Sequence, residues 1–398
     1  MKKKLMVSLS LMASMAAMVL FTGANSASSA QSASSIISSL PDAIKSQYVG
    51  VADTVALSTY SNFKKVAGPW TVCYSESYVG NPWRVSLANE IKRLAALYKT
   101  AGLVSDFKMS VSDNDVARQS QQIRQFATSK CSVIITVAGS ATALNSAISA
   151  AKAKGIPVIT IAGAVTSPWA VNVDSNYAVM GAELAESAVK ASKNVVMVKG
   201  IEGSPIATQQ NDAAKAVFKA KGATVVAEVN GNWTPSITKD AILNVITKNS
   251  GDIGAIWTTG SETAIIAQAF KDAGRPAPVI MGSISGDAIG FWKANPSDFK
   301  FDGVALMPTW TAQTGFNVAM RVLSGQGPIL STMMVPVPHV TSADLAGMWK
   351  ACMTPTAGSI FPVVPKDPLP ANLMNAYFKK GAPVGPFDYA KTPDPCAA

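Results

Sequence analysis

Short apolar runs alternate with amphipathic segments along most of the chain. Between residues 130 and 163, the runs CSVIITV and IPVITI flank the segment SATALNSAISAAKAKG, and each run opens into a glycine turn. Two β-rich runs joined by one helix predict a right-handed parallel crossover, and such units bind ligands beyond the carboxyl ends of their strands. The pattern therefore predicts a ligand held there by backbone groups and neighbours. The residues at these ends are small and uncharged: Ala138, Gly139, Ser140, Ala162 and Gly163.

The alternation of predicted strands and helices runs through the chain twice. The first set begins at Trp70, and the second restarts after residue 174 with a helix over 177–192 and the strands NVVMVKG, TVVAEV, DIGAIW and PVIMG. Two doubly wound sets fit two lobes better than one very wide parallel sheet. A further strand, VALMPTW, and a helix over 314–324 are expected to return the chain to the first lobe. We therefore predict an α/β protein of two Rossmann-like lobes, with a boundary near Ser175.

The two ends of the chain depart from this alternation. Lys2, Lys3 and Lys4 precede an apolar stretch and small-residue sites, as a cleaved secretory leader requires. The Ser- and Ala-rich segment before Trp70 is expected to pack on the first lobe, and the Pro-rich tail beyond Thr341 is expected to be irregular. The predicted organisation is a leader over 1–30, an extension over 31–68, a first lobe over 69–174 and 309–335, and a second lobe with the tail over 175–308 and 336–398.

The charge of the chain does not indicate a nucleic-acid partner. The formal charge is +10, which falls to +7 without the three leader lysines, and Lys/Arg clusters beyond the leader are only pairs such as Lys64 and Lys65. Charged residues are 15% of the chain, which suits a compact α/β protein. No segment after the leader is long and apolar enough to cross a bilayer. We expect a soluble protein that is exported to the periplasm.

The chain offers little for catalysis or metal binding. His339 is the single histidine, and its surroundings, VPVPHVTS, predict a Pro-flanked edge strand rather than a Ser-His-Asp relay. The cysteines lack CxxC spacing, so no zinc site is expected. The Gly-rich turns match neither dinucleotide nor P-loop motifs, and GSISG has isoleucine where a nucleophile elbow needs serine. We therefore predict a protein without enzymatic activity, cofactor or metal.

Four cysteines in an exported chain favour disulfides. Cys352 and Cys396 bracket the irregular tail, where a bridge would substitute for a missing core, and we predict that they are paired. Cys73 and Cys131 lie on or beside core strands. They could pair, but buried free thiols are equally consistent with the sequence, because adjacent parallel strands would place the two residues out of register. The state of this second pair is left open.

Aromatic and amide residues gather where predicted strands end. Asn81 and Trp83 follow the first strand, Trp233 follows EVNGN, and Trp310 follows VALMPT. Each could be a core residue, but their recurrence at strand ends favours binding. Flat aromatic rings against C–H-rich faces, with amides and hydroxyls around them, suit a neutral polyhydroxylated molecule. We predict that Trp83 and Trp233 face each other across a cleft between the lobes.

Several segments in order resemble the type I periplasmic sugar-binding proteins of the ribose- and galactose-binding family. They run from about Trp70 to Pro328 and include SYVGNPW, NDVARQSQQIRQF, KAKGIPVITI, VNVDSNYAVMGAELA, KGIEGSPIATQQNDAAKAVF and AIWTTGSETAIIAQAFKDAG. The resemblance implies two lobes joined by three hinge crossings that close on a ligand. It also implies a monomeric receptor that delivers a small carbohydrate to an ABC permease and its ATPase.

The resemblance further implies positions for the ligand. The aromatic residue that the family places after its first strand corresponds to Trp83, with Asn81 nearby, and the stacking aromatic of its second lobe corresponds to Trp233. The ligand arginine of the family falls near Gln210. These correspondences imply a binding site between the two lobes.

Other charged hydroxyl-binding groups of the family are missing or displaced. Its usual Asp-Arg pair is replaced by Ala162 and Gly163, and Ser283, Ser285 and Asp287 lie nearest to its second-lobe acidic residue. We therefore expect a different ligand, smaller or less polar than a pyranose. The predicted ligand-binding residues are Tyr78, Asn81, Trp83, Arg84, Ser140, Gly163, Asp174, Gln209, Gln210, Trp233, Thr258, Gly260, Glu262, Ser283, Ser285, Asp287, Thr309 and Trp310.

Three alternatives are open at this point. The same fold could bind an autoinducer, a nucleoside, a sugar acid or an amino acid. An amino acid needs fixed charges for its ammonium and carboxylate groups, for which only Glu76, Arg84, Glu202 and Asp287 are candidates. A repressor of this fold would need a helix-turn-helix and no leader, and a secreted enzyme would need a nucleophile and base that the sequence does not reveal.

Overall fold

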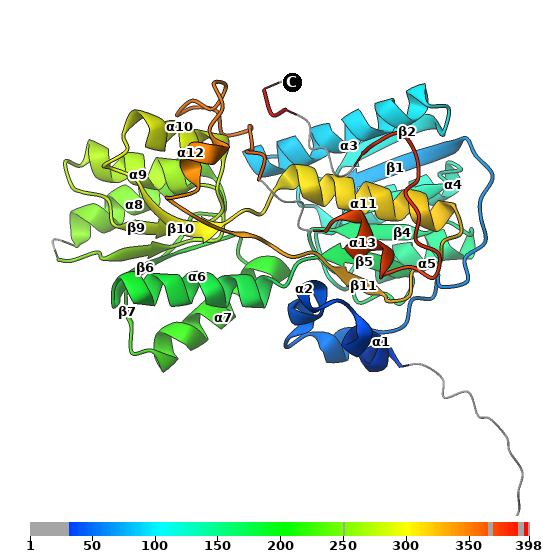
Figure 1. The fold of residues 1–398 in the computed structure, drawn as a ribbon, viewed down its shortest axis with the longest axis horizontal. Coiled ribbons are helices and arrows are strands. Elements are labelled where there is room, and N and C mark those ends of the chain that lie inside the picture. Colours follow the sequence, from blue (N-terminus) through cyan, green and yellow to red (C-terminus); the bar gives the residue numbers. More distant parts are fainter. Residues whose placement is uncertain (1–31, 250, 365–368, 389–393, 397–398) are drawn as a thin grey trace, which may run out of the picture. The chain divides into compact units, whose positions relative to one another are not determined.

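The computed structural model describes residues 32–249, 251–364, 369–388 and 394–396, and within them the strands form two six-stranded sheets (Figure 1). The first sheet has the order β11-β5-β4-β3-β1-β2, and all of its neighbouring strands are parallel. Its strands are β1 (Trp70–Glu76), β2 (Val104–Val111), β3 (Val133–Val137), β4 (Val158–Ile161), β5 (Ala170–Asp174) and β11 (Thr332–Met334). Its helices are α3 (Pro82–Thr100), α4 (Val116–Thr128), α5 (Asn145–Ala153) and α11 (Pro308–Leu323).

The second sheet has the order β12-β10-β9-β8-β6-β7 and is parallel except for the antiparallel pair β10–β12. Two sheets of this kind confirm the predicted α/β architecture of two lobes. The strands are β6 (Asn194–Lys199), β7 (Thr224–Asn230), β8 (Ala255–Trp257), β9 (Val279–Met281), β10 (Lys300–Val304) and β12 (His339–Thr341). The helices are α6 (Tyr177–Ala191), α7 (Pro205–Ala220), α8 (Pro235–Lys248), α9 (Thr263–Asp272) and α10 (Gly286–Ala294).

Each sheet is buried on both faces, as the continuous apolar strands require. In the first lobe, α3 and α11 lie together on one face, and residues of α4 and α5 pack on the other. In the second lobe, α8, α9 and α10 cover one face, and α6 and α7 cover the opposite one. His339 lies at the sheet edge in β12, where its Nε2 is 2.6 Å from Oδ1 of Asp302. This position matches the edge strand predicted for it.

The start of α3 shows how local sequence positions a functional segment. The side chain of Asn81 accepts a hydrogen bond from the backbone N–H of Arg84 at 2.9 Å, and Pro82 occupies the first turn of the helix. An amide N-cap followed by proline is a strong helix-start signal, because it satisfies a free N–H and presets the backbone. The cap therefore places Trp83 and Arg84 just beyond the carboxyl end of β1.

From β1 to β12 the chain crosses between the lobes three times, between β5 and α6, between β10 and α11, and between β11 and β12. The predicted strand VALMPTW over 304–310 is wrong. The strand ends at Val304, and α11 begins at Pro308, because proline suits the first turn of a helix and cannot donate within a sheet. Trp310 therefore lies in the first turn of α11 rather than at a strand tip.

The tail does not stay with the second lobe, to which the sequence analysis assigned all of 336–398. Residues of the segment 345–364, including α12 (Leu345–Met348), pack in the second-lobe core. Residues of the segment 369–387, including α13 (Ala371–Asn375), pack in the first-lobe core. Tyr377 explains this return, because its buried hydroxyl donates to the carbonyl of Met334 at 2.8 Å and accepts from the N–H of the same residue at 3.0 Å.

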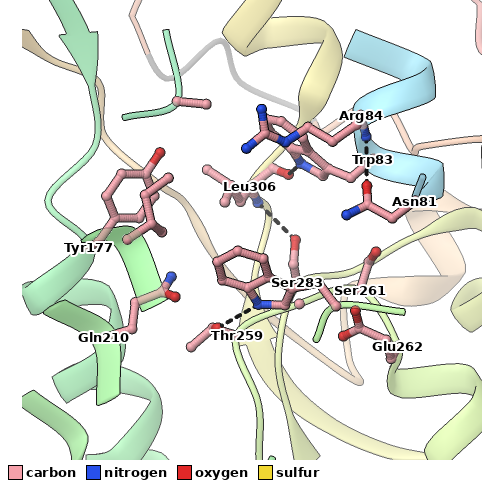
Figure 2. A pocket seen from close by; sticks show the side chains of 14 residues that line it. Asn81, Trp83, Arg84, Tyr177, Gln210, Thr259, Ser261, Glu262, Ser283 and Leu306 are labelled. Atoms are coloured by element: carbon pink, nitrogen blue, oxygen red, sulfur yellow. Dashed lines mark hydrogen bonds between the residues drawn. The ribbon is translucent and has the colours of Figure 1, made fainter. Parts of the chain in front are cut away.

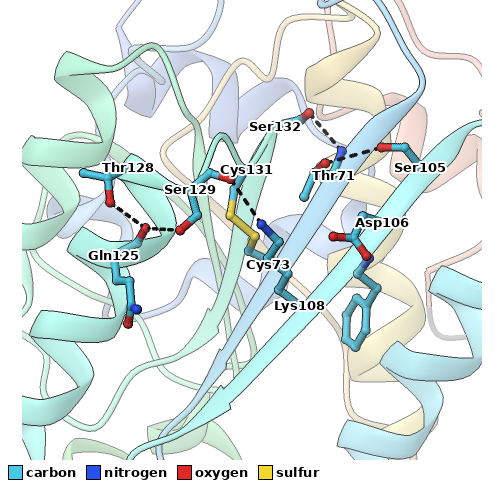
Figure 3. Close-up of a disulfide and its surroundings, with 11 residues drawn as sticks. Thr71, Cys73, Ser105, Asp106, Lys108, Gln125, Thr128, Ser129, Cys131 and Ser132 are labelled. Atoms are coloured by element: carbon cyan, nitrogen blue, oxygen red, sulfur yellow. Dashed lines mark hydrogen bonds between the residues drawn. A yellow bond between two sulfur atoms is a disulfide. The ribbon is translucent and has the colours of Figure 1, made fainter.

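Both cysteine pairs form disulfides. The bridge between Cys352 and Cys396 was predicted and is confirmed. The bridge between Cys73 and Cys131 settles the open pair, with a Cα–Cα distance of 5.9 Å (Figure 3). The register objection does not apply, because Cys131 precedes β3 and lies in the turn that leads into it.

The N-terminal extension packs in the first-lobe core through residues of α1 (Ala33–Ser39), α2 (Asp42–Lys45) and two short 3-10 turns at Ser46–Tyr48 and Ala52–Thr54. It also reaches the first hinge crossing, where Asn176 donates to the carbonyl of Val49 at 2.8 Å. Among the helices that the structure describes, none has the length and hydropathy to cross a membrane. The predicted leader over 1–30 lies outside the described residues.

Candidate functional site

A cavity of about 60 Å³ lies where residues of both lobes and of the second hinge crossing meet (Figure 2). Asn81, Trp83 and Arg84 come from the start of α3 in the first lobe. Most of the other lining residues follow strands of the second sheet. The full lining is Asn81, Trp83, Arg84, Ala162, Tyr177, Ile206, Gln210, Trp233, Thr259, Gly260, Ser261, Glu262, Ser283 and Leu306.

The first-lobe wall is held by hydrogen bonds to the hinge and to β1. Trp83 Nε1 donates to the carbonyl of Leu306 at 2.8 Å, and Arg84 lies over the Trp83 ring at 5.7 Å from its centroid. Arg84 Nη1 also donates to Oε1 of Glu76 at 2.8 Å. Tyr74 donates to the other carboxylate oxygen of Glu76.

Glu76 is fully buried, and burial raises the pKa of its carboxyl, while the charge of Arg84 opposes this rise. A buried carboxylate needs a charged or hydrogen-bonded partner, which Arg84 provides. The guanidinium is therefore engaged within the protein. Arg84 lines the cavity, and its positive charge is compensated by the carboxylate of Glu76.

Trp233 forms the second-lobe wall, and two glycines make room for its ring. A side chain at Gly200 would collide with the six-membered part of the indole, and one at Gly260 would meet its Cδ1 at 2.6 Å. Trp233 and Asn232 both have positive φ, at 50° and 53°, a conformation that a short turn after β7 imposes. The Nε1 of Trp233 lies 3.2 Å from Oγ1 of Thr259, to which it donates.

Among the described residues, two buried side-chain oxygens of the cavity have no hydrogen-bond partner. They are Oε1 of Gln210, whose residue is 1% exposed, and Oε2 of Glu262, whose residue is 4% exposed. Burial, together with the smaller effect of the nearby charge of Asp287, raises the pKa of Glu262 to about 7. Buried polar atoms are normally paired, so two orphaned acceptors in one cavity indicate places for ligand donors.

Asp174 has a structural role beside the cavity. It accepts hydrogen bonds from the backbone N–H groups of Gly163 at 3.2 Å and Ala164 at 2.9 Å. Burial raises its pKa to about 7, and these hydrogen bonds oppose the rise. The carboxyl thus holds the turn after β4, which leaves Ala162 on the cavity wall with φ of 50°.

The structure brings eight of the predicted residues to this cavity: Asn81, Trp83, Arg84, Gln210, Trp233, Gly260, Glu262 and Ser283. Others lie elsewhere. Gln209 is exposed on α7, and Asp287 lines a separate cavity. Trp310 lines a cavity between α11 and the tail. The predicted residues that do not line the cavity are Tyr78, Ser140, Gly163, Asp174, Gln209, Thr258, Ser285, Asp287, Thr309 and Trp310.

Six lining residues are not among the predicted ligand-binding residues: Ala162, Tyr177, Ile206, Thr259, Ser261 and Leu306. Tyr177 directly follows the first hinge crossing, so its place beside the boundary was an available signal. Ile206 and Leu306 are aliphatic and carry no chemical signal that separates them from core residues. Among the described residues, no group of three His, Cys, Asp or Glu side chains could hold a metal ion.

Comparison with known proteins gives a family match. A family model described as a periplasmic binding protein domain matches residues 72–327. The same two-lobed fold recurs among solved structures. An ABC transporter solute-binding protein of Thermobispora bispora is 21% identical, with a TM-score of 0.68 over 80% of this chain and 98% of that chain. A solute-binding protein of Mycobacterium smegmatis with bound glycerol is 16% identical, with a TM-score of 0.64 over 75% and 100%.

Two curated proteins are similar in sequence. A xylitol-binding protein of Mycolicibacterium smegmatis is 26% identical over 221 residues, which are 54% of this chain and 62% of that protein. A ribose import binding protein of Haemophilus influenzae is 23% identical over 261 residues, which are 64% of this chain and 86% of that protein. The chain thus spans less than two thirds of the length of the first relative.

Proposed function

The chain belongs to the periplasmic binding protein domain family, and we propose that it is the solute-binding component of an ABC importer that captures a small neutral polyol or monosaccharide. The observation that carries the proposal is the pair of orphaned acceptors, Gln210 Oε1 and Glu262 Oε2, in a cavity that also has two tryptophans. Hydroxyl groups can donate to these acceptors, and C–H faces can pack on the rings. The names of the similar proteins, which include xylitol, ribose and glycerol, support the same ligand class.

A neutral ligand fits the charges of the cavity. Arg84 is paired with Glu76, and Glu262 has a pKa of about 7, so neither offers a permanent free charge at slightly acidic pH. A charged ligand would need an opposite charge or several backbone N–H groups.

Capture by this receptor involves no chemical step, in keeping with a family of binding proteins rather than enzymes. Trp83 comes from the first lobe and Trp233 from the second. A ligand that contacts both walls stabilises the closed arrangement, because the open one lacks half of those contacts. A permease could then distinguish loaded from empty receptor by lobe geometry. We infer that the protein acts as a monomer exported to the periplasm, with an ABC permease and its ATPase as partners.

Titration calorimetry with the full mature chain tests the ligand class. The panel contains xylitol, glycerol, D-ribose and myo-inositol, followed by a sugar acid, an amino acid and a nucleoside. We expect micromolar binding of one or more neutral members, with an affinity that does not change between low and high salt. Binding confined to the sugar acid, the amino acid or the nucleoside would overturn the proposal.

Small-angle scattering tests the capture mechanism separately. We expect the radius of gyration to decrease when a binding polyol is added to saturation. An unchanged radius at saturation would contradict closure of the lobes, even if calorimetry shows binding.

A further inference from the structure

One segment of the tail, residues 353–360, is attached to the second lobe and is called the tail loop here. The backbone N–H of Gly286 in α10 donates to the carbonyl of Ile360 at 2.7 Å. A Cβ at Gly286 would lie 2.6 Å from that same carbonyl oxygen, and one at Gly290 would collide with the backbone of Thr354. Backbone therefore packs directly on backbone along α10, and the two glycines make this possible. Cys352, one residue before the loop, is bonded to Cys396.

The tail loop also contacts the first lobe. Ser86, in the second turn of α3, donates from its hydroxyl to the carbonyl of Ser359 at 2.6 Å. Ser86 is 9% exposed, whereas Ser359 is exposed, so this hydrogen bond is partly buried. A Cβ at Gly358 would lie 3.6 Å from Cγ of Pro82, so the loop backbone lies close to the same helix. The loop thus joins α10 of one lobe to α3 of the other.

This contact lies outside the ligand cavity but beside it. A second cavity, of about 600 Å³, is lined by Pro82 and Val85 of α3, by Pro235 of α8, and by Ser359 of the tail loop. Asn81 lines both this cavity and the ligand cavity. Neither Ser86 nor any tail-loop residue lines the ligand cavity. The loop therefore connects the two lobes without a direct route to the ligand.

We propose that the tail loop is a latch, in which the hydrogen bond from Ser86 to Ser359 holds the two lobes together beside the ligand cavity. The proposal rests on the proposed function in one respect, that the lobes open and close. A contact that exists only when α3 and α10 are close shifts the population toward the closed arrangement. One such hydrogen bond corresponds to about a threefold to tenfold change in that equilibrium. The latch slows ligand release without touching the ligand.

The test compares Ser86→Ala with wild type in the full mature chain. Alanine removes the donor and is the best helix former, so α3 is expected to remain intact. Ser39→Ala is the matched control, because the Ser39 hydroxyl donates to the carbonyl of Ile36 within its own helix at 2.7 Å. Ser86→Thr, which keeps a hydroxyl, tests for rescue.

We measure two properties of the ligand-free protein, the radius of gyration and the hydrogen exchange of residues 353–360. We also measure xylitol dissociation by stopped-flow fluorescence. Ser86→Ala is expected to increase the radius, to speed exchange of the tail loop, and to raise the dissociation rate about threefold to tenfold. Ser39→Ala should match wild type, and Ser86→Thr should recover at least part of the wild-type behaviour.

Failure of the latch is distinguishable from failure of the proposed function. If no neutral ligand of the panel binds wild type, the proposed function fails, and the scattering and exchange of the ligand-free variants still decide on the latch. A wild-type radius and wild-type exchange in Ser86→Ala would overturn the latch whether or not xylitol binds.

Discussion

The indole Nε1 of Trp83 donates to the carbonyl oxygen of Leu306 at 2.8 Å, although the two residues are 223 positions apart. Trp83 belongs to the first lobe, and Leu306 lies in the second hinge crossing. The hydrogen bond fixes the orientation of a ring that lines the ligand cavity. Because this hydrogen bond ties Trp83 to the hinge segment, the orientation of a ring that lines the cavity depends on how the two lobes are placed.

Replacement of either cavity tryptophan should weaken polyol binding. Trp83→Ala and Trp233→Ala are each expected to cost about 1 to 4 kcal/mol of binding free energy, because each removes a large buried contact. Calorimetry with the best-binding member of the neutral panel measures the loss. Trp349→Ala is the control, since Trp349 is 36% exposed and does not line the cavity. Wild-type affinity in both cavity variants would exclude a stacking role.

Because of Glu262, the ligand-free protein should have a lower free energy of unfolding above pH 7 than at acidic pH. Its pKa is raised from 4.5 to about 7, so the folded state favours the protonated form. This contribution to stability is present in full below pH 4.5 and is lost as the pH rises through 7. The loss is on the order of 3 kcal/mol for a shift of this size.

The variant Glu262→Gln tests this pH dependence. It should flatten the decrease in unfolding free energy between pH 5 and pH 8, measured by denaturant titration of ligand-free protein. Asp174, whose pKa is also about 7, keeps part of the decrease in place. Glu202→Gln serves as the control, because Glu202 is exposed and lies outside the cavity. An unchanged pH slope in Glu262→Gln would show that Glu262 is not the source.

Gly260 should be intolerant of any side chain. A Cβ there would collide with Oε2 of Glu262 and would lie 2.6 Å from Cδ1 of Trp233. Gly260→Ala is therefore expected to displace one or both side chains and to weaken polyol binding by tenfold or more, measured by calorimetry. Gly347→Ala is the matched control, since nothing lies within 4 Å of a Cβ at Gly347. Equal affinities of the two variants would contradict the packing described for the cavity.

The disulfide between Cys352 and Cys396 should stabilise the tail. It closes a loop with a sequence separation of 44, for which the chain-entropy model gives about 4 kcal/mol. The double variant Cys352→Ser with Cys396→Ser is expected to lower the unfolding free energy by up to that amount. Mass spectrometry of a non-reduced digest of wild type should recover both this bridge and the one between Cys73 and Cys131. Free thiols at these positions in exported protein would argue against the bridges.

Local sequence was sufficient for the architecture of the two lobes. The apolar runs of β3 and β4 and the segment between them predicted a parallel crossover, because strand and helix periodicities differ and are readable within about ten residues. The start of α3 was similarly encoded by Asn81 and Pro82, whose capping effects act within one turn. The segment VALMPTW was predicted as a strand, although Pro308 within it is itself a local signal for the start of α11.

The tertiary structure decided which of the candidate residues share the cavity and where the tail lies. Asp174 and Glu262 are both buried acidic residues close to strand ends. Asp174 accepts hydrogen bonds from the backbone N–H groups of the turn after β4, whereas Oε2 of Glu262 has no hydrogen-bond partner among the described residues. The tail returns to the first lobe, where the hydroxyl of Tyr377 forms hydrogen bonds with the backbone of Met334. The sequence by itself therefore determined the elements and their class, since these follow from interactions between near neighbours. The contacts that build the site and place the tail join residues far apart in the chain, and only the packed fold brings those residues together.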